Sequence, residues 1–591
     1  MLNGRIYRAA CLPLLLALVI AGVSFGSRPA PLTSNLSPDA FDGAQTTEEL
    51  AHLAGEFPDR HPGSDADNRL AAYIAQKITA LGGPSSGGFR VSTRRFQGQT
   101  TEGQRTLTNV IARRPGSSDA NPIVIIAHRD AVGRGAQAEL SATAVLLELA
   151  RVFASRETSH PIILASTSGG SGGDAGVIDL ANHLARPIDA AIVLGDLASV
   201  DVHRPFVIPS SESLGGAPAQ LVGTVEHSIM AQVGTEPGGQ GIFDQFAHLA
   251  FPLAVGEQGP LIAAGIPAVL VQVSGEQGPS PNAPVSATRV ENFGRAVLDA
   301  VDAIDGGPEI SSASQSLQIH KETIPSWSVR LLVGALILPV LILALDALAR
   351  VRRRREPVGL WSLWTLSCAG PFFASAVLVF LLARLGVPNG SPSAPVLARA
   401  MPVDGAAKAL LVVLLLLLLL MWLCWPFLTR RLGLQKRPDG AGAGVAVLLV
   451  LTATAVLVWI ANPFAALLLI LPLHLFLFVL APELRPRRWL GLAVIALALV
   501  PAGLLVFFYA HEFAAGPTGV VWAVVLQLGG GHLGFLAALL ASLFLGCVSA
   551  SILVALQGKT STGLPQAVSI RGPISYAGPG SLGGTESALR R

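Results

Sequence analysis

The second half of the chain consists of long apolar segments that alternate with short basic or turn-rich pieces. A helix needs roughly 20 mainly apolar residues to cross the hydrocarbon core of a bilayer. An apolar segment of that order, Ala9–Gly26, follows Arg5 and Arg8 near the start of the chain. The pattern predicts eight transmembrane helices, with a cleaved signal peptide as the alternative for the first. The other seven segments are Leu331–Leu348, Leu360–Leu385, Ala406–Leu428, Gly444–Ile460, Phe464–Leu480, Leu490–Tyr509 and Leu533–Val554.

Basic residues are distributed unevenly among the loops of this half. They cluster at 350–355, 430–437 and 485–488, whereas the loops Ala461–Pro463 and Ala510–Gly519 carry no Lys or Arg. Short loops rich in Lys and Arg stay in the cytoplasm. The asymmetry predicts that both termini are cytoplasmic and that the polar region at 28–325 is extracytoplasmic.

Two segments of this half have a less clear hydropathy pattern than the predicted transmembrane helices. Val520–Gly531 ends in a glycine run, so it is either a re-entrant piece or an extension of the last helix. Residues 558–591 are rich in Gly, Ser and Pro, which predicts a disordered cytoplasmic tail. The predicted organisation is therefore a signal anchor at 1–27, an exported domain at 28–325, a seven-helix membrane domain at 326–557 and the tail.

The exported region alternates short apolar runs with amphipathic stretches. Strand, helix and strand in repetition predict an α/β domain with a mainly parallel mixed sheet and helices on both faces. The predicted strands are Leu107–Ala112, Ile123–Ala127, Ile162–Ser166, Ala190–Leu194 and Ala268–Val273. The predicted helices are Asn68–Leu81, Ala142–Phe153, Val177–Leu184 and Val290–Ile304.

Composition narrows the class of protein. Hydrophobic residues make up 51% of the chain and charged residues only 13%, against about 25% in a soluble globular protein. A net charge of +3 gives no electrostatic basis for nucleic-acid binding. All four cysteines lie in apolar stretches, so the exported region contains neither disulfides nor thiolate metal sites. A composition rich in Ala, Arg and Gly and poor in Lys suggests a high-GC bacterium, and hence the plasma membrane.

Several exported segments follow the order and spacing of one family. They are HPGSDADNRLAAYIAQKITALG at 61–82, TLTNVIARRPGS at 106–117, IVIIAHRDAV at 123–132, GAQAELSATAVLLELARVF at 135–153, IILASTSGGSGGDAG at 162–176, IVLGDL at 192–197 and GPLIAAGIPAVLV at 259–271. Over roughly residues 45–305 the chain resembles the co-catalytic zinc aminopeptidases, and with them the glutaminyl cyclases and the peptidase-like domain of glutamate carboxypeptidase.

The resemblance implies two zinc ions that share a carboxylate and activate one water. His128 matches the histidine that binds the first zinc, Asp130 matches the aspartate that orients its ring, and Asp196 matches a further ligand of that zinc. The rest of the family pattern is missing. Ala138 stands where the bridging Asp belongs, with Glu139 beside it.

Gly170 and Ser171 occupy the positions of the family's Glu-Glu pair, which supplies the general base and a ligand to the second zinc. The loop GEQGPSPNAPVSATRVE at 275–291 lacks the expected last histidine, and GEQ at 256–258 replaces the family's S-D-H. These losses predict a non-catalytic domain that binds or scaffolds within a membrane complex. The alternative is a metallopeptidase or amide-transferring enzyme with one zinc held by His128, Asp196 and Glu139.

The layout of one span, an exported peptidase-like domain and seven further spans resembles the GPI-anchor attachment subunit of GPI transamidase and membrane-bound zinc peptidases. It implies protein partners in the membrane and a peptide or lipid-headgroup ligand. The glycine-rich SGGSGG at 168–173 is either a simple turn or an anion site. Midway along its span, His474 is either a functional group or an interhelical hydrogen-bonding residue. His511 and Glu512 either dock the exported domain, bind a headgroup or are solvated.

Overall fold

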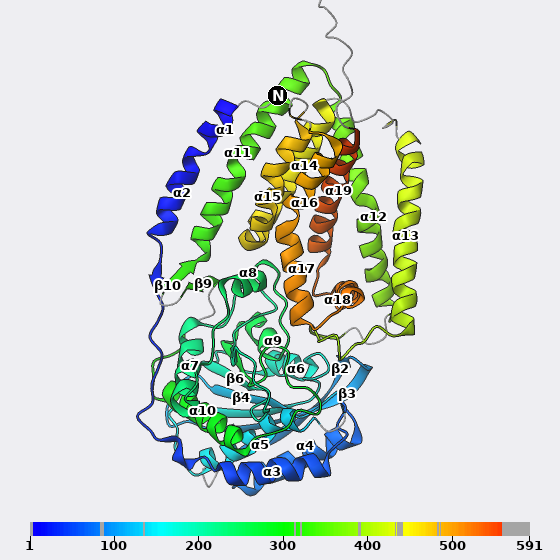
Figure 1. The fold of residues 1–591 in the computed structure, drawn as a ribbon. Helices are drawn as coiled ribbons and strands as arrows, with labels where there is room; N and C mark the ends of the chain where they lie inside the picture. Colours follow the sequence, from blue (N-terminus) through cyan, green and yellow to red (C-terminus); the bar gives the residue numbers. More distant parts are fainter. Residues whose placement is uncertain are drawn as a thin grey trace, which may run out of the picture.

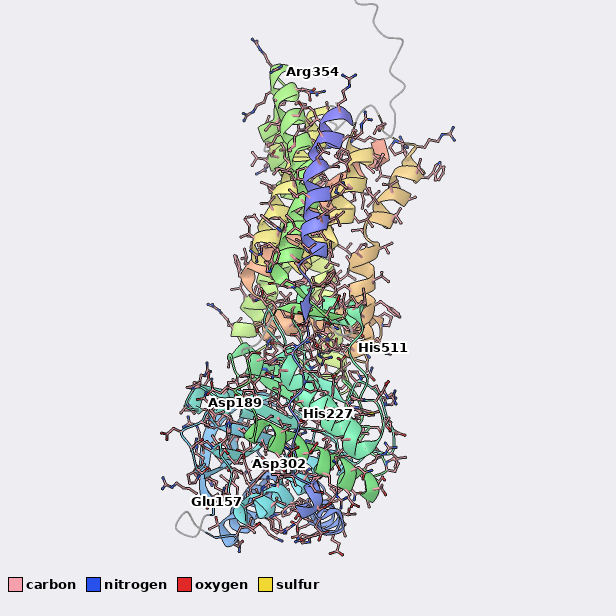
Figure 2. All side chains as sticks on the ribbon, turned by 90° about the vertical axis from the view of Figure 1, so that its left-hand side faces the viewer. Glu157, Asp189, His227, Asp302, Arg354 and His511 are labelled. Atoms are coloured by element: carbon pink, nitrogen blue, oxygen red, sulfur yellow. The ribbon has the colours of Figure 1, made fainter. Side chains whose placement is uncertain are left out.

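The computed structural model describes residues 4–82, 88–133, 136–311, 315–319, 322–387, 392–431, 433, 441–481, 484 and 486–557. The predicted tail at 558–591 lies outside them. The chain forms a bundle of long helices and a sheet domain that rests on one end of it (Figure 1). Arg354 lies at the far end of the bundle, whereas His511 lies at the junction with the sheet domain (Figure 2).

The sheet domain is built on a seven-stranded mixed sheet in the order β2-β3-β5-β4-β6-β8-β7. Strands β5, β4, β6 and β8 are parallel to one another, and the strands at both edges are antiparallel. The strands are β2 (Arg90–Thr100), β3 (Gly103–Arg114), β4 (Ile123–His128), β5 (Ile162–Thr167), β6 (Ala190–Leu194), β7 (Val207–Ile208) and β8 (Ala268–Val271). The mixed α/β fold is therefore confirmed.

Helices cover both faces of this sheet (Figure 1). One face carries α4 (Asp65–Ala80), α5 (Gln137–Ala154) and α10 (Ala287–Asp305), with α3 (Gly43–Glu56) packed outside them. The face toward the bundle carries α6 (Ala175–His183) and α9 (Gln258–Ala263). Short η1 (Pro38–Ala40), α7 (Ala219–Val233) and α8 (Ile242–Ala250) complete the domain.

All five predicted strands and all four predicted helices are present, several of them longer than predicted. Strand β2 is absent from the predicted set, and so are α3, α7, α8 and α9. The sequence of β2, RVSTRRFQGQT, lacks an apolar face because it lies at the edge of the sheet with most side chains at least partly exposed. Apolar alternation marks a strand only where one of its faces is buried.

A buried ion pair connects the end of strand β4 to helix α4. The guanidinium of Arg129, directly after β4, pairs through Nε with Asp67 Oδ1 of α4 at 2.8 Å. The same guanidinium donates to Thr108 O of β3 at 2.6 Å and to Ser166 O of β5 at 3.1 Å. Both charged side chains are fully buried. A charge without access to water needs such complete pairing, so Arg129 holds four elements in register.

The bundle accounts for every predicted span. Seven helices of the described chain are long and apolar enough to cross a membrane, and a bent pair, α16 (Arg488–Ala498) and α17 (Val500–Glu512), counts as an eighth. The chain is therefore a membrane protein. The seven candidate spans besides the bent pair are α1 with α2 (Gly4–Ala10 and Leu12–Gly22, one span), α11 (Ser326–Arg353), α12 (Val358–Arg384), α13 (Gly405–Arg431), α14 (Ala441–Ala461), α15 (Pro463–Leu480) and α19 (Phe535–Gln557).

The ambiguous segment at 520–531 forms a helix of its own. α18 (Pro517–Gly529) is separated from α19 by a glycine-containing break and lies at the end of the bundle that faces the sheet domain (Figure 1). It is therefore not an extension of the last helix. Gly531 adopts a φ of 83°, which ends α18 in a conformation that other residues avoid.

His474 joins three helices of the bundle. Its Nδ1 lies 2.7 Å from Tyr7 Oη of α1, and its Nε2 lies 3.1 Å from Leu336 O of α11. The interhelical hydrogen-bonding role thus has direct geometric support. The contact also gives the N-terminal helix a partner within the bundle.

The two bodies contact each other closely. Asn462, at the start of α15, donates to Leu249 O and Ala250 O of α8 at 2.8 and 3.1 Å. Tyr509 of α17 donates to Phe251 O after the same helix. The chain passes between the two bodies after α2 and again before α11. A short three-stranded sheet of β1 (Gly26–Ser27), β10 (Glu322–Pro325) and β9 (Ser316–Ile319) connects these two segments. The sheet domain is therefore docked on the bundle.

We predict that Asp67→Ala destabilises the protein by about 3–5 kcal/mol, because it leaves the buried Arg129 without its counter-charge. Thermal unfolding of the full chain in detergent would show a lower midpoint. The double change Asp67→Leu with Arg129→Met should cost less than the sum of the single changes, since no unpaired charge remains. Strictly additive effects would contradict the assigned pairing.

Candidate functional site

The carboxyl ends of the four parallel strands open into one pocket. His128 ends β4, Thr167 ends β5 beside it, Asp196 follows β6, and Gln272 follows β8. His128, Asp196 and Gln272 line a cavity of about 270 Å³. Open α/β sheets place their binding sites at this edge because the loops that follow the strands diverge there.

A segment of the membrane domain forms the roof of this pocket. Pro395, Val396, Leu397, Arg399 and Ala400, between α12 and α13, line it opposite the strand ends. Two hydrogen bonds fasten the segment to the sheet domain. Ser393 donates to Gln99 O at 3.0 Å and Arg399 to Gln277 O at 2.7 Å. The pocket is thus an interdomain site.

The structure brings His128, Glu139 and Asp196 to the walls of this single pocket. One carboxylate oxygen of Asp196 accepts from the backbone N–H groups of Ala198 and Ser199, while its Oδ2 is buried without a hydrogen-bond partner. Glu139 Oε2 is likewise buried and unpartnered. The three side chains do not form a cluster in which every ligand atom lies within 4.8 Å of the others.

The carboxylate of Asp130 is held by the glycine-rich loop. Its Oδ1 accepts from the N–H groups of Gly169 and Gly170 at 2.7 and 3.0 Å, and its Oδ2 accepts from Ser171 N at 3.1 Å and Ser171 Oγ at 2.5 Å. These four donors fix the carboxylate, and the role of Asp130 in orienting the His128 ring stays a prediction.

The same loop leaves no room for a general base at its family position. A Cβ atom added to Gly170 would lie 2.4 Å from His128 Cβ and 2.6 Å from His128 Cγ. Real Cβ atoms do not approach backbone-proximal atoms this closely. Gly170 is thus required by the position of His128, and a glutamate at 170 would displace the imidazole. In SGGSGG, the N–H groups of Gly169, Gly170 and Ser171 donate to Asp130, so these three are not available to an external anion.

Glu257 is the acidic residue that sequence reasoning missed. It precedes α9, and its Oε1 accepts a hydrogen bond from Thr167 Oγ1 at 2.6 Å. Its Oε2 lies 3.9 Å from His128 Nδ1 and has no hydrogen-bond partner. Burial raises the pKa of Glu257 to about 8, although the hydrogen bond from Thr167 opposes the rise. The family's S-D-H position, occupied here by GEQ, was the available signal.

Other buried groups set the charge of the pocket. Burial raises the pKa of Glu139 to about 7, against the opposing effect of the Arg60 and Arg399 guanidinium groups. Burial also raises the pKa of Asp174 well above its usual value, and Glu257 reinforces the rise. The pKa of His128 is lowered because burial disfavours the imidazolium. At pH 7 the Glu257 carboxyl is therefore mainly neutral, the Glu139 carboxyl is about half ionised, and burial favours the neutral imidazole of His128.

The residues present do not fit the pair of zinc ions that the resemblance implies. A dinuclear site needs a bridging carboxylate and ligands for both ions. Ala138 and Gly170 supply neither, and His128, Glu139 and Asp196 are not drawn together around one point. Within the described residues, the group with metal-binding spacing is His248, Glu276 and Glu512, at the interface with the bundle.

Comparison with known families finds one match, to peptidase family M28, over residues 109–214. The matched stretch runs from the middle of β3 past β7 and contains His128, Asp130, Glu139, Gly170 and Asp196. It excludes Glu257. This part of the sheet domain is thus similar to peptidase family M28, in a chain that also has helices long and apolar enough to span a membrane. No curated protein matches the chain.

Several solved structures align with part of the chain. A zinc aminopeptidase from Bacillus subtilis aligns at 13% identity over 44% of this chain and 94% of its own, with a TM-score of 0.35. LapB from Legionella pneumophila aligns at 16% identity over 50% of this chain and 81% of its own, with a TM-score of 0.38. An Acidobacteriales glutaminyl cyclase aligns at 16% identity over 47% and 99%, with a TM-score of 0.37.

We predict that Gly170→Ala destabilises the protein by about 1–3 kcal/mol, the range for overpacking a filled site. The added methyl group meets the His128 side chain, so the cost should be smaller in a His128→Gly background. Thermal midpoints of the two single variants and the double variant measure this coupling. An equal cost in both backgrounds would show that the imidazole does not occupy the space.

We also predict a pH-dependent effect of Glu257→Gln. The folded-state pKa of Glu257, about 8, lies above its ordinary value of 4.5, so the folded state binds the proton more tightly. The wild type therefore loses stability as pH rises from about 4.5 to about 8. The neutral amide lacks this loss, so the midpoint of Glu257→Gln relative to wild type should rise across that window. A constant difference between pH 5 and pH 8.5 would refute the raised pKa.

Proposed function

We propose that this membrane protein uses its M28-type domain for binding or scaffolding in a membrane complex, and that the domain does not catalyse peptide hydrolysis. The observation that carries the proposal is the contact of Gly170 with His128. The position of the family's general base is closed by the imidazole itself. A change of one residue back to glutamate would not restore the base, because the backbone there is too close to His128.

The ligand chemistry we propose follows from the walls of the pocket. Glu139, Asp174, Asp196, Glu257 and Glu276 contribute carboxyl groups, whereas Arg399 is the basic side chain lining it in the described chain. A small group that carries a positive charge, such as the amine of a peptide or of a lipid headgroup, would be stabilised there by ionising these acids. The roof, which comes from the membrane domain, supports a ligand that lies near the bilayer.

A second function is favoured by one observation. Glu139 Oε2, Asp196 Oδ2 and Glu257 Oε2 are all buried in or beside the pocket without hydrogen-bond partners. Carboxylates left in this way are the residues that a cation would satisfy. This supports the alternative of an enzyme, a metallopeptidase or amide-transferring protein with one zinc ion bound after local rearrangement.

We further propose that both termini face the cytoplasm of a bacterial cell and that the sheet domain lies outside the plasma membrane. The clustered arginines support this orientation, since the end of α11 that carries Arg354 is opposite the sheet domain (Figure 2). The layout also supports protein partners in the membrane, by analogy with the attachment subunit of GPI transamidase.

The test is hydrolysis of aminoacyl amides by the full chain in detergent, with and without added zinc. We expect no hydrolysis that depends on His128, so wild type and His128→Ala should give the same background rate. His227→Ala, which removes an exposed histidine of α7, serves as the matched control. Zinc-dependent turnover that falls at least about 100-fold in His128→Ala alone would favour the enzyme.

A further inference from the structure

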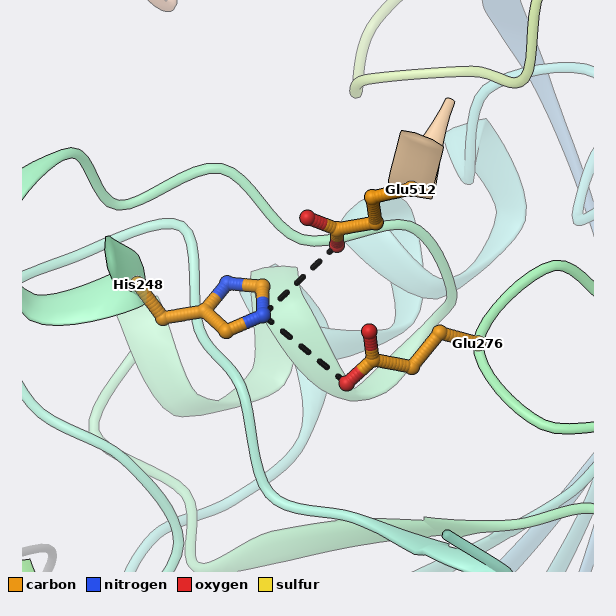
Figure 3. Close-up of side chains that lie close together, drawn as sticks. All are labelled: His248, Glu276 and Glu512. Atoms are coloured by element: carbon orange, nitrogen blue, oxygen red, sulfur yellow. Dashed lines mark ion pairs between the residues drawn. The ribbon is translucent and has the colours of Figure 1, made fainter. Parts of the chain in front are cut away.

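Three ionisable side chains meet where the sheet domain touches the bundle. His248 comes from α8, Glu276 from the loop after β8, and Glu512 from the last position of α17 (Figure 3). His248 Nε2 lies 3.8 Å from Glu276 Oε1 and 3.7 Å from Glu512 Oε1. Each residue offers a ligand atom within 4.8 Å of the other two. The group lies apart from His128, although Glu276 also lines the pocket.

The imidazole of His248 is fixed with Nε2 directed at the two carboxylates. Its Nδ1 lies 3.0 Å from Leu253 O, which can only accept, so Nδ1 carries a hydrogen. The rings of Phe508 and Tyr509 pack edge-on against the imidazole, with centroids 5.5 and 6.0 Å away. A histidine that donates one ring N–H to a backbone carbonyl and presents the other nitrogen is the arrangement of a metal ligand.

The distances exclude direct hydrogen bonds in this group. A separation of 3.7 or 3.8 Å is too long for an N–H···O bond. Zinc forms bonds of about 2.0–2.2 Å to imidazole nitrogen and carboxylate oxygen, so two ligand atoms on one tetrahedral ion lie about 3.3–3.6 Å apart. The observed separations of 3.7 and 3.8 Å are slightly longer, so small side-chain shifts bring the three ligand atoms onto one ion.

Burial makes the empty gap costly. The side chains of His248 and Glu512 are 5% and 3% exposed. His248 Nε2 and Glu512 Oε2 have no hydrogen-bond partner. In the part of the chain that the structure describes, the ion pairs of Glu276 and Glu512 are with His248 alone. Two buried acidic side chains that face one imidazole need a positive charge, which a protonated His248 supplies when no ion is bound and which a metal cation at Nε2 would supply in its place.

We propose that His248, Glu276 and Glu512 bind a divalent transition-metal ion, of which zinc suits one imidazole and two carboxylates. Glu276 Oε1 also accepts from Gln240 Nε2 at 2.8 Å, which orients this ligand from outside the site. Glu512 Oε2 or a water molecule completes four-coordination. Since Glu512 belongs to the bundle and the other two ligands to the sheet domain, the ion clamps the two bodies together.

The test measures metal content of the full chain, purified in detergent and dialysed without chelator after loading with zinc. We expect about one zinc per chain in wild type and a loss of at least tenfold in His248→Ala and in the isosteric Glu512→Gln. His227→Ala is the matched control for removal of a histidine and should retain the ion. Retention of zinc in both ligand variants, or no zinc in loaded wild type, would overturn the site.

The variant His128→Ala separates this inference from the function proposed for the pocket. Zinc that is lost in His128→Ala but kept in His248→Ala would overturn the clamp and support the one-zinc enzyme. Zinc lost in His248→Ala and kept in His128→Ala supports the clamp and leaves the pocket without a metal.

A second measurement covers the case in which a ligand variant fails to fold. The thermal midpoint of chelator-treated wild type should rise with added zinc, because the ion binds only the folded, docked form. The midpoint of folded Glu512→Gln should not respond. A wild-type midpoint that is independent of zinc would contradict the clamp.

Discussion

The pairing of Arg129 with Asp67 is the interaction on which the rest of the sheet domain depends. It buries two opposite charges at the point where β3, β4, β5 and α4 converge. Asp67 also accepts from Ser168 Oγ at 2.6 Å, so the glycine-rich loop after β5 is anchored to the same pair. That loop places Gly170 against His128 and leaves its amides to Asp130. The shape of the pocket is therefore a consequence of satisfying one buried cation.

The sequence was sufficient for elements whose burial is uniform. Parallel strands such as Ile123–His128 are apolar on both faces, and the spans are apolar throughout, so hydropathy locates both kinds. It was insufficient for β2, which has no buried face, and for α8 and α9, which are too short for a clear helical period. Apart from the acidic residue Glu512, no local sequence pattern indicated that the sheet domain docks on the bundle. Docking depends on contacts between residues far apart in the chain.

The candidate site was predicted in part. His128, Glu139 and Asp196 do line one pocket, since strand ends in a parallel sheet converge. The family pattern predicted that position 170 is altered, but it could not show that the imidazole of His128 lies where a side chain at 170 would extend. Asp174 and Glu257 lie in segments that were compared with the family, but the resemblance assigns no ligand role to either, and Arg399 lies outside all of these segments. Arg399 lies in the membrane domain, so no motif of the exported region could have pointed to it.

The roof formed by Pro395–Ala400 changes how the pocket meets its surroundings. Its far wall belongs to a connection between two spans, so the volume is partly defined by how those spans sit in the lipid. A fragment that ends at residue 325 would expose the strand ends and present an open groove instead of a chamber. The thickness and lateral pressure of the bilayer therefore affect the shape of the pocket and with it ligand binding. A soluble protein of the same fold has no such dependence.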